Sequence, residues 1–184
     1  MGDRLLKSVV LVGMMGAGKT AVGKSVAVKL GVPFLDSDEQ IEIAANMTIA
    51  EIFERDGEEF FREKETQVIN RLLLEEKCIL STGGGAFLAQ RNRVIIREHG
   101  VSVWLRADLD LLWNRVRHKS TRPLLRTSDP FKTLSEIYEA RVPLYGRADI
   151  VVDANPNYSI EEMAETVIKA LQARPDVLET NRNA

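Results

Sequence analysis

The sequence predicts an α/β fold in three layers, with a central five-stranded parallel sheet between helices. Five short apolar segments alternate with helical patterns along the chain, and strands that alternate with helices assemble into parallel sheets. The first apolar segment runs into a glycine-rich turn that is followed at once by a helical pattern. A chain of 184 residues with no internal break fits one domain, which we place at residues 1–173.

The five predicted strands are short and rich in β-branched and other apolar residues, as buried strands are. They cover residues 9–13, 34–38, 78–82, 101–105 and 150–153. Capping-box spacing predicts three helix starts, at Thr48 with Glu51, Thr133 with Glu136 and Ser159 with Glu162. The last helix has one apolar face, which we expect to pack on the core and which contains Ile160, Met163, Ala164, Val167, Ile168 and Leu171. Residues 174–184 are polar and unpatterned, and we expect them to be disordered.

Composition and charge narrow the classes of function. The net charge of −2 gives no general attraction to nucleic acid, and no apolar run approaches the ~20 residues of a membrane span. The amino terminus lacks the apolar region of a signal peptide, and a single cysteine, Cys78, fits a reducing compartment. We therefore expect a cytoplasmic protein without nucleic-acid or membrane partners. No feature demands an oligomer, so we expect a monomer.

Residues 13–20 match the phosphate-binding pattern G-x-x-x-x-G-K-[ST], between a predicted strand and a predicted helix. The glycines let consecutive backbone N–H groups converge on an anion at the positive end of the helix dipole. Lys19 adds a charge for the β and γ phosphates, and Thr20 adds a hydroxyl for Mg²⁺. The expected ATP contacts come from Gly16, Ala17, Gly18, Lys19, Thr20 and Ala21. The alternative is a glycine-rich turn that binds nothing, and the complete pattern argues against it.

Two carboxylates, Asp36 and Asp38, end the second apolar segment. Alternate residues of a strand share a face, so both side chains would point into the crevice beside the phosphate-binding loop. One would support Mg²⁺ and the other would accept a hydrogen bond from an alcohol; the alternative is an ordinary pair of strand-end or N-cap aspartates. The third apolar segment runs into three glycines, residues 83–85, without a carboxylate. Asp36 is therefore the predicted metal ligand beside Thr20.

Two further segments carry arginines suited to anions. Arg62 and Glu65 lie three apart on a predicted helix, where the carboxylate would orient the guanidinium; the alternative is a solvated ion pair. Residues 115–125 are basic and contain a proline, which indicates a mobile lid over the nucleotide at about residues 115–127. Within the lid, Arg122 is the expected clamp on the transition state, because its charge is permanent and its fork is planar.

Together these motifs resemble the shikimate kinase family. The match runs in order over nearly the whole chain: Gly-Met-Met-Gly-Ala-Gly-Lys-Thr at 13–20, Asp-Ser-Asp at 36–38, Phe-Arg-Glu-Lys-Glu at 61–65, Gly-Gly-Gly at 83–85, Arg-Pro-Leu-Leu at 122–125 and Arg-Val-Pro-Leu-Tyr at 141–145. The resemblance implies a P-loop kinase fold like that of nucleoside monophosphate kinases, with a lid and a mobile acceptor-binding region at about residues 38–65. It also implies transfer of the γ-phosphoryl group of ATP to the 3-hydroxyl of shikimate, on the route to chorismate and the aromatic amino acids.

The resemblance implies an acceptor pocket built from separate motifs. Arg62 and Arg141 would bind the shikimate carboxylate, while Asp38 and the backbone of Gly84 would bind its hydroxyls. The flanking glycines complete the expected pocket, which then contains Asp38, Arg62, Gly83, Gly84, Gly85 and Arg141. Asp38 either takes the hydroxyl proton or only binds the acceptor, and the residues alone leave both open.

For the nucleotide, the resemblance implies contacts from the lid and from a loop near the carboxyl end. Arg122 would contact the phosphates and, with Lys19 and Asp38, complete the catalytic set. Adenine would lie between a lid arginine, Arg117 in preference to Arg115, and the loop that contains Asn155 and Pro156. The cofactor would be Mg²⁺. Two other functions stay open at this stage: a kinase for another small hydroxy acid such as gluconate, and an ATP-driven switch without an acceptor pocket.

Overall fold

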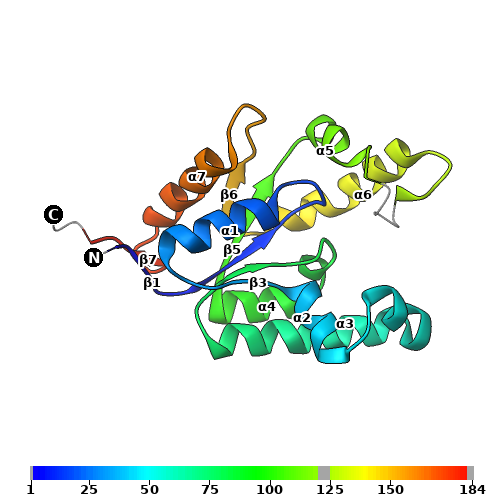
Figure 1. Ribbon diagram of the computed structural model, residues 1–184, viewed down its shortest axis with the longest axis horizontal. Helices are drawn as coiled ribbons and strands as arrows, with labels where there is room; N and C mark the ends of the chain where they lie inside the picture. Colours follow the sequence, from blue (N-terminus) through cyan, green and yellow to red (C-terminus); the bar gives the residue numbers. More distant parts are fainter. Residues whose placement is uncertain (1, 120–124, 182–184) are drawn as a thin grey trace.

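The computed structural model describes residues 2–119 and 125–181, which form one α/β unit around a five-stranded sheet (Figure 1). The strand order is β3-β4-β2-β5-β6 and every neighbouring pair is parallel, as predicted. The strands are β2 (Ser8–Val12), β3 (Phe34–Asp36), β4 (Ile79–Ser81), β5 (Gly100–Arg106) and β6 (Ile150–Asp153). The five strands fall on the five predicted segments, with ends that differ by up to two residues.

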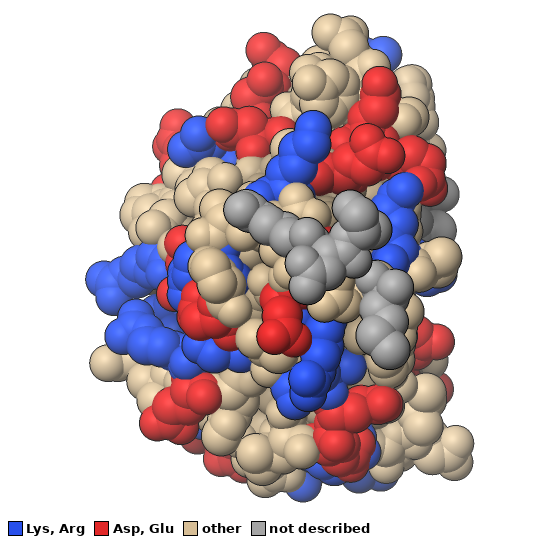
Figure 2. Space-filling model, turned by 90° about the vertical axis from the view of Figure 1, so that its left-hand side faces the viewer, with Lys and Arg blue, Asp and Glu red and all other residues tan. Residues whose placement is uncertain are grey.

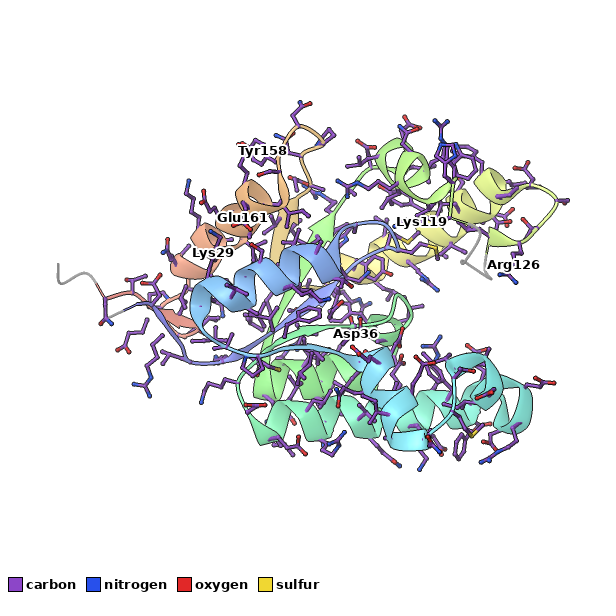
Figure 3. All side chains as sticks on the ribbon, in the orientation of Figure 1. Lys29, Asp36, Lys119, Arg126, Tyr158 and Glu161 are labelled. Carbon is purple, nitrogen blue, oxygen red and sulfur yellow. The ribbon has the colours of Figure 1, made fainter. Side chains whose placement is uncertain are left out.

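Helices cover both faces of the sheet and complete the three predicted layers. They are α1 (Lys19–Leu30), α2 (Ser37–Ala45), α3 (Ile49–Glu75), the short 3₁₀ turn η1 (Ala86–Leu88), α4 (Gln90–His99), α5 (Leu109–Val116), α6 (Pro130–Tyr145) and α7 (Ile160–Gln172). Helix α1 packs against α7, and α3 packs against α4 (Figure 1). Lys29 of α1 and Glu161 of α7 lie side by side in Figure 3, with 3.0 Å between Nζ and Oε2. No helix among the described residues is both long enough and apolar enough to cross a bilayer.

The central strand β2 is buried along its whole length, because parallel strands covered on both faces have no solvent side. Residues Val9 to Val12 are 0% exposed, and they deliver the chain directly into the phosphate-binding loop. The sheet therefore forms a rigid base for the loops that follow the carboxyl ends of its strands.

On the surface, acidic and basic side chains are interspersed over the face shown in Figure 2.

The second strand ends two residues earlier than predicted. Its last residue, Asp36, is the N-cap of α2, and its Oδ1 accepts hydrogen bonds from the N–H groups of Asp38 (2.9 Å) and Glu39 (3.2 Å). An aspartate side chain satisfies the unpaired N–H groups of a helix start, and here this outweighs continuation of the strand. The strand alternation argument for Asp36 and Asp38 is therefore wrong, and the N-cap alternative is correct for Asp36.

Two of the three predicted helix starts are confirmed. Thr48 and Ser159 each form a complete capping box with the glutamate three residues later. The prediction at Thr133 is wrong, because the N-cap of α6 is Asp129, four residues earlier, and Pro130 lies in the first turn. Inside that helix, Oγ1 of Thr133 bonds to the Asp129 carbonyl oxygen instead. A proline whose fixed φ suits the first helical turn moves the start upstream.

The predicted disorder of residues 174–184 is wrong for the part that the structure describes. Strand β7 (Leu178–Glu179) pairs antiparallel with β1 (Arg4–Leu5) near the amino terminus. Val177 is 0% and Leu178 is 1% exposed, so two apolar side chains anchor a segment that is otherwise polar. The sequence pattern missed this strand because two residues are too few for a periodic signal.

Candidate active site

The phosphate-binding loop follows β2 and adopts backbone conformations that only glycine accepts easily. Gly13 has φ 143° and Gly16 has φ 82°, and a Cβ at either position would lie within 3 Å of a neighbouring atom. Lys19 is the first residue of α1, and its Nζ donates to the carbonyl oxygens of Gly13 (2.6 Å) and Met14 (3.0 Å). The ammonium group therefore lies over the loop at the positive end of α1.

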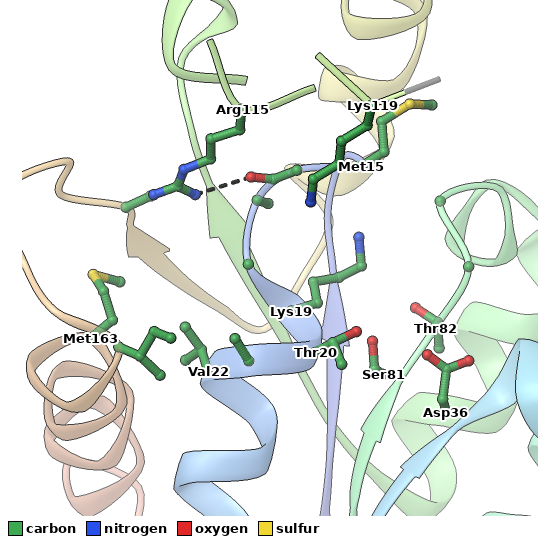
Figure 4. Close-up of a pocket in the computed structure, with 18 of the residues that line it drawn as sticks. Met15, Lys19, Thr20, Val22, Asp36, Ser81, Thr82, Arg115, Lys119 and Met163 are labelled. Carbon is green, nitrogen blue, oxygen red and sulfur yellow. Dashed lines mark hydrogen bonds between the residues drawn. The ribbon is translucent and has the colours of Figure 1, made fainter. Parts of the chain in front are cut away.

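A cavity of about 650 Å³ opens at the carboxyl ends of the strands, in front of this loop (Figure 4). One wall is the loop and the start of α1. The opposite wall holds the ends of β3 and β4, and the far end is formed by α7 and the segment before it. The lining residues are Met15, Gly16, Ala17, Gly18, Lys19, Thr20, Ala21, Val22, Asp36, Asp38, Ser81, Thr82, Gly83, Gly84, Arg115, Lys119, Ala154, Tyr158, Ser159, Ile160 and Met163.

The predicted metal ligands Thr20 and Asp36 both line this cavity, and Ser81 and Thr82 lie next to them in Figure 4. Oδ1 of Asp36 accepts both N-cap hydrogen bonds, so Oδ2 is the carboxylate oxygen that these bonds leave unused. Within residues 2–119 and 125–181 no three His, Cys, Asp or Glu side chains gather into a metal site. A hydroxyl and one carboxylate suit Mg²⁺, which takes its remaining ligands from phosphates and water.

The three glycines after β4 each face one of the predicted acceptor side chains. An ideal Cβ would lie 2.8 Å from Oδ1 of Asp38 if built on Gly83, and 2.5 Å from Nη1 of Arg141 if built on Gly84. A Cβ on Gly85 would lie 2.5 Å from Nη2 of the third side chain, Arg62. The absence of side chains at these glycines thus lets the carboxylate of Asp38 and the guanidinium groups of Arg141 and Arg62 lie close to the loop backbone.

The carbonyl oxygens of this triglycine loop (residues 83–85) are all held by the protein. The N–H of Ala86 donates to Gly83, and the N–H of Leu88 donates to Gly85, at 3.1 and 3.2 Å. The hydroxyl of Tyr145, which is 0% exposed, donates to the Gly84 carbonyl oxygen at 2.6 Å. The loop N–H groups have no acceptor among the described residues, so they are the groups available to a ligand.

Sequence reasoning gave no role to Tyr145, although its position contains a signal. Tyr145 lies four residues after Arg141 on α6, so both side chains project from the same face of that helix. They contact the same glycine, Gly84, from two directions. Burial raises the pKa of the Tyr145 phenol, which therefore stays protonated and keeps donating to the loop.

Asp38 lies between groups of both signs. Its pKa is raised to about 6, chiefly by burial and then by the nearby carboxylates of Asp36 and Glu65, while Lys19 and Arg62 oppose the shift. Burial also raises the pKa of Glu65, which Arg62 opposes through its charge and its hydrogen bond. A carboxylate with a pKa near 6 is ionised at neutral pH and remains a better proton acceptor than an ordinary aspartate.

The lid arginines are placed differently from the prediction. Arg115 lines the cavity and donates through Nη1 to the Gly16 carbonyl oxygen at 3.0 Å (Figure 4). Arg117 caps the end of α5, bonds to His118 and does not line the cavity. The preference for Arg117 is thus not supported by the geometry. Arg122 lies outside the described residues.

The predicted adenine loop stands beside the cavity and not in its wall. Asn155 and Pro156 are absent from the lining, which takes Ala154 and Tyr158 on either side of them. The Asn155 side chain accepts from the N–H of Asn157 at 2.9 Å, and this bond turns it back on its own loop. The apolar side chain of Met163 from α7 was missed, because its helical spacing is that of a core residue.

The chain is similar to known proteins along most of its length. The family model described as shikimate kinase matches residues 15–172. A shikimate kinase of Ruegeria pomeroyi is 67% identical over 175 residues, 95% of this chain and 90% of that protein. One of Cereibacter sphaeroides is 65% identical over 178 residues, 97% of this chain and 89% of the other.

Among solved structures, a shikimate kinase from Acinetobacter baumannii in complex with shikimate has a TM-score of 0.85 and 37% identity, over 91% of this chain and 94% of that one. A gluconokinase from Sinorhizobium meliloti has a TM-score of 0.62 and 20% identity, over 92% of this chain and 94% of that one, which shows a shared fold only. The family match covers most of the chain, and the two relatives above match nearly all of it. The chain therefore belongs to the shikimate kinase family.

Proposed function

We propose that this cavity carries out the ATP-dependent phosphorylation of shikimate at its 3-hydroxyl, with the nucleotide over the phosphate-binding loop and shikimate beside the triglycine loop. The observation that carries the proposal is the convergence of Asp38, Arg62 and Arg141 on that loop, each against a different glycine. A small anion with several hydroxyls needs guanidinium groups at one end and a carboxylate at the other. The relative from Acinetobacter baumannii, whose complex contains shikimate, supports the same substrate.

At the nucleotide end, the backbone N–H groups of Gly16 to Ala21 surround the phosphates, and Lys19 exchanges its two carbonyl acceptors for the β and γ oxygens. Arg115 closes the adenine side from the lid. Arg122 remains our candidate for the transition-state clamp on the basis of the family motif. These groups position the γ-phosphoryl group and balance its charge, which is most of what phosphoryl transfer requires of a protein.

Thr20 and Asp36 would hold Mg²⁺, through the threonine hydroxyl and the carboxylate oxygen that is free of the N-cap bonds. When bound, this ion neutralises charge on the phosphate oxygens. The two side chains come from the first residues of α1 and the last residue of β3, so both are attached to rigid elements.

At the acceptor end, Arg62 and Arg141 bind the carboxylate of shikimate and hold the ring in one orientation. Asp38 accepts a hydrogen bond from the hydroxyl that attacks the γ-phosphorus. Its raised pKa favours removal of that proton as the new P–O bond forms. We further propose a monomeric enzyme of the cytoplasm, where a buried free thiol such as that of Cys78 is stable.

A substrate panel tests this proposal. With Mg²⁺ and ATP, we expect rapid turnover of shikimate and only background rates with gluconate or nucleoside monophosphates. Rapid turnover of gluconate would move the protein to another kinase class. ATP hydrolysis at the same rate with and without any acceptor would instead indicate an ATP-driven switch.

A further inference from the structure

Asn92, in the first turn of α4, is a buried polar residue behind the acceptor pocket. It is 1% exposed and does not line the cavity. Its Nδ2 donates to the Ala86 carbonyl oxygen at 2.8 Å, and its Oδ1 lies 2.7 Å from Oγ1 of Thr66. This orientation of the amide is the consistent one, because the reverse would place its oxygen against a carbonyl oxygen.

These two bonds join the elements that carry the two halves of the pocket. Ala86 directly follows the triglycine loop, while Thr66 lies one turn after Arg62 on α3 and its hydroxyl also lies 3.0 Å from the Arg62 carbonyl oxygen. The loop and α3 meet where the Arg62 guanidinium packs against Gly85. The loop and α3 share no β-ladder, and the two hydrogen bonds of Asn92 form a direct link between them.

The neighbouring residue, Arg93, holds the loop side of this connection. Nη1 of Arg93 donates to the carbonyl oxygens of Phe87 (2.7 Å) and Leu88 (2.8 Å), the next two residues of η1. The first turn of α4 therefore holds three consecutive carbonyl groups behind the loop. Of the side chains of Asn92 and Arg93, only that of Asn92 has a described hydrogen bond to α3.

We propose that Asn92 is a positioning residue for shikimate, which sets the distance between the triglycine loop and Arg62. The inference rests on the proposed location of shikimate in this pocket. The side-chain hydrogen bonds described for Asn92 go to Ala86 and Thr66, on the acceptor side of the site, so its loss acts on acceptor binding and leaves ATP binding intact. An unpaired Ala86 carbonyl group would let the loop shift relative to the guanidinium.

The test compares Asn92→Leu, which nearly preserves volume, with the wild-type enzyme in steady-state kinetics. We expect KM for shikimate to rise about tenfold, the scale of a lost buried hydrogen bond, while KM for ATP and kcat change by less than about twofold. Thr66→Val should raise KM for shikimate about threefold because it removes one bond, and Thr66→Ser, which keeps the hydroxyl, should restore it. The Thr66 pair also tests the inference if Asn92→Leu fails to fold.

Ser8→Ala is the matched control. Ser8 is 1% exposed, accepts a hydrogen bond from the Cys78 N–H, and lies at the opposite end of the sheet. We expect it to lower Tm without changing KM for shikimate. If Asn92→Leu folds with an unchanged KM for shikimate, or raises both KM values equally, the positioning role is wrong. Arg141→Ala in the same assay separates the positioning role of Asn92 from the proposed location of shikimate. If Arg141→Ala does not raise KM for shikimate, the proposed acceptor site itself is wrong.

Discussion

Nη1 of Arg62 donates to both carboxylate oxygens of Glu65, at 3.0 and 3.2 Å. The Glu65 side chain is 1% exposed and the Arg62 side chain is 29% exposed, so the carboxylate is fixed in the interior while the guanidinium stays partly open to solvent beside Gly85. The ion pair between Arg62 and Glu65 is thus half-buried, and the alternative of a solvated pair is wrong. Such a pair orients the remaining N–H donors of Arg62 toward a ligand.

Substitution of the pocket arginines should separate the two substrates. We expect Arg62→Ala and Arg141→Ala each to raise KM for shikimate by about tenfold to a hundredfold, since a charge-assisted hydrogen bond contributes roughly 1.5–3 kcal/mol. KM for ATP should change much less. The control is Arg71→Ala, which removes an exposed ion pair with Glu75 from the same helix. Equal effects on both substrates would indicate a structural role for the arginines.

The raised pKa of Asp38 predicts a pH dependence of the rate. If the ionised carboxylate binds the attacking hydroxyl, kcat/KM for shikimate should fall as pH drops through about 6, where Asp38 becomes protonated. Asp38→Asn should reduce turnover by a factor on the order of 10² and remove this limb of the profile. If Asp38→Asn loses only affinity for shikimate and keeps its kcat, then Asp38 binds the acceptor and does not take its proton.

The same shift predicts a change in stability with pH. The folded pKa of Asp38 lies above its ordinary value of 3.8, so the folded state binds the proton more tightly than the unfolded state. The stabilisation of the folded state by this proton is fully present below about pH 4 and is lost as pH rises through about 6. In urea unfolding, Asp38→Asn should therefore gain stability over the wild type at about pH 8 and lose that gain at about pH 4. A constant difference across this range would contradict the shift.

Lys19→Met should abolish phosphoryl transfer while the protein stays folded. The substitution removes the charge aimed at the phosphates but keeps most of the side-chain volume at the start of α1, in the cavity wall. Turnover measured with saturating shikimate and circular dichroism of the same sample would check both parts. Near-normal turnover of the folded variant would overturn the nucleotide site.

The two lid arginines form a natural pair for comparison. Arg115→Ala removes the bond to the Gly16 carbonyl oxygen and one cation of the cavity wall, so KM for ATP should rise about tenfold. Arg117→Ala removes a group that bonds to His118 and does not line the cavity, and it should change KM for ATP by less than about twofold. The reverse order of effects would restore the sequence-based preference for Arg117.

The carboxyl-terminal strand should contribute measurably to stability. Leu178→Ala truncates a side chain that is 1% exposed, and we expect it to lower the free energy of unfolding by about 2–4 kcal/mol. The exposed neighbour provides the control, since Glu179→Ala should change the free energy of unfolding by less than about 0.5 kcal/mol. Denaturant unfolding gives both values. An unchanged midpoint for Leu178→Ala would mean that the segment is not anchored.

Local sequence patterns were sufficient for the strand–helix alternation, the phosphate-binding loop and the family. These features are encoded over a few consecutive residues: a β-branched run, a glycine spacing, a capping box such as that of Ser159. Where two local signals competed, the pattern failed. At Asp36 the N-cap preference prevailed over strand alternation, and at Thr133 an upstream Asp-Pro pair provided the helix start.

The tertiary structure alone decided how distant segments meet. Tyr145 reaches Gly84 across 61 residues of sequence, Arg115 reaches Gly16 across 99, and Leu5 pairs with Leu178. A short-range pattern contains no information about such contacts, because they depend on how the sheet orders its strands and where each connecting loop ends. The sequence by itself determined the fold class, the phosphate-binding loop and the set of candidate residues for the chemistry, and the packing of strands and helices determined which of them face each other.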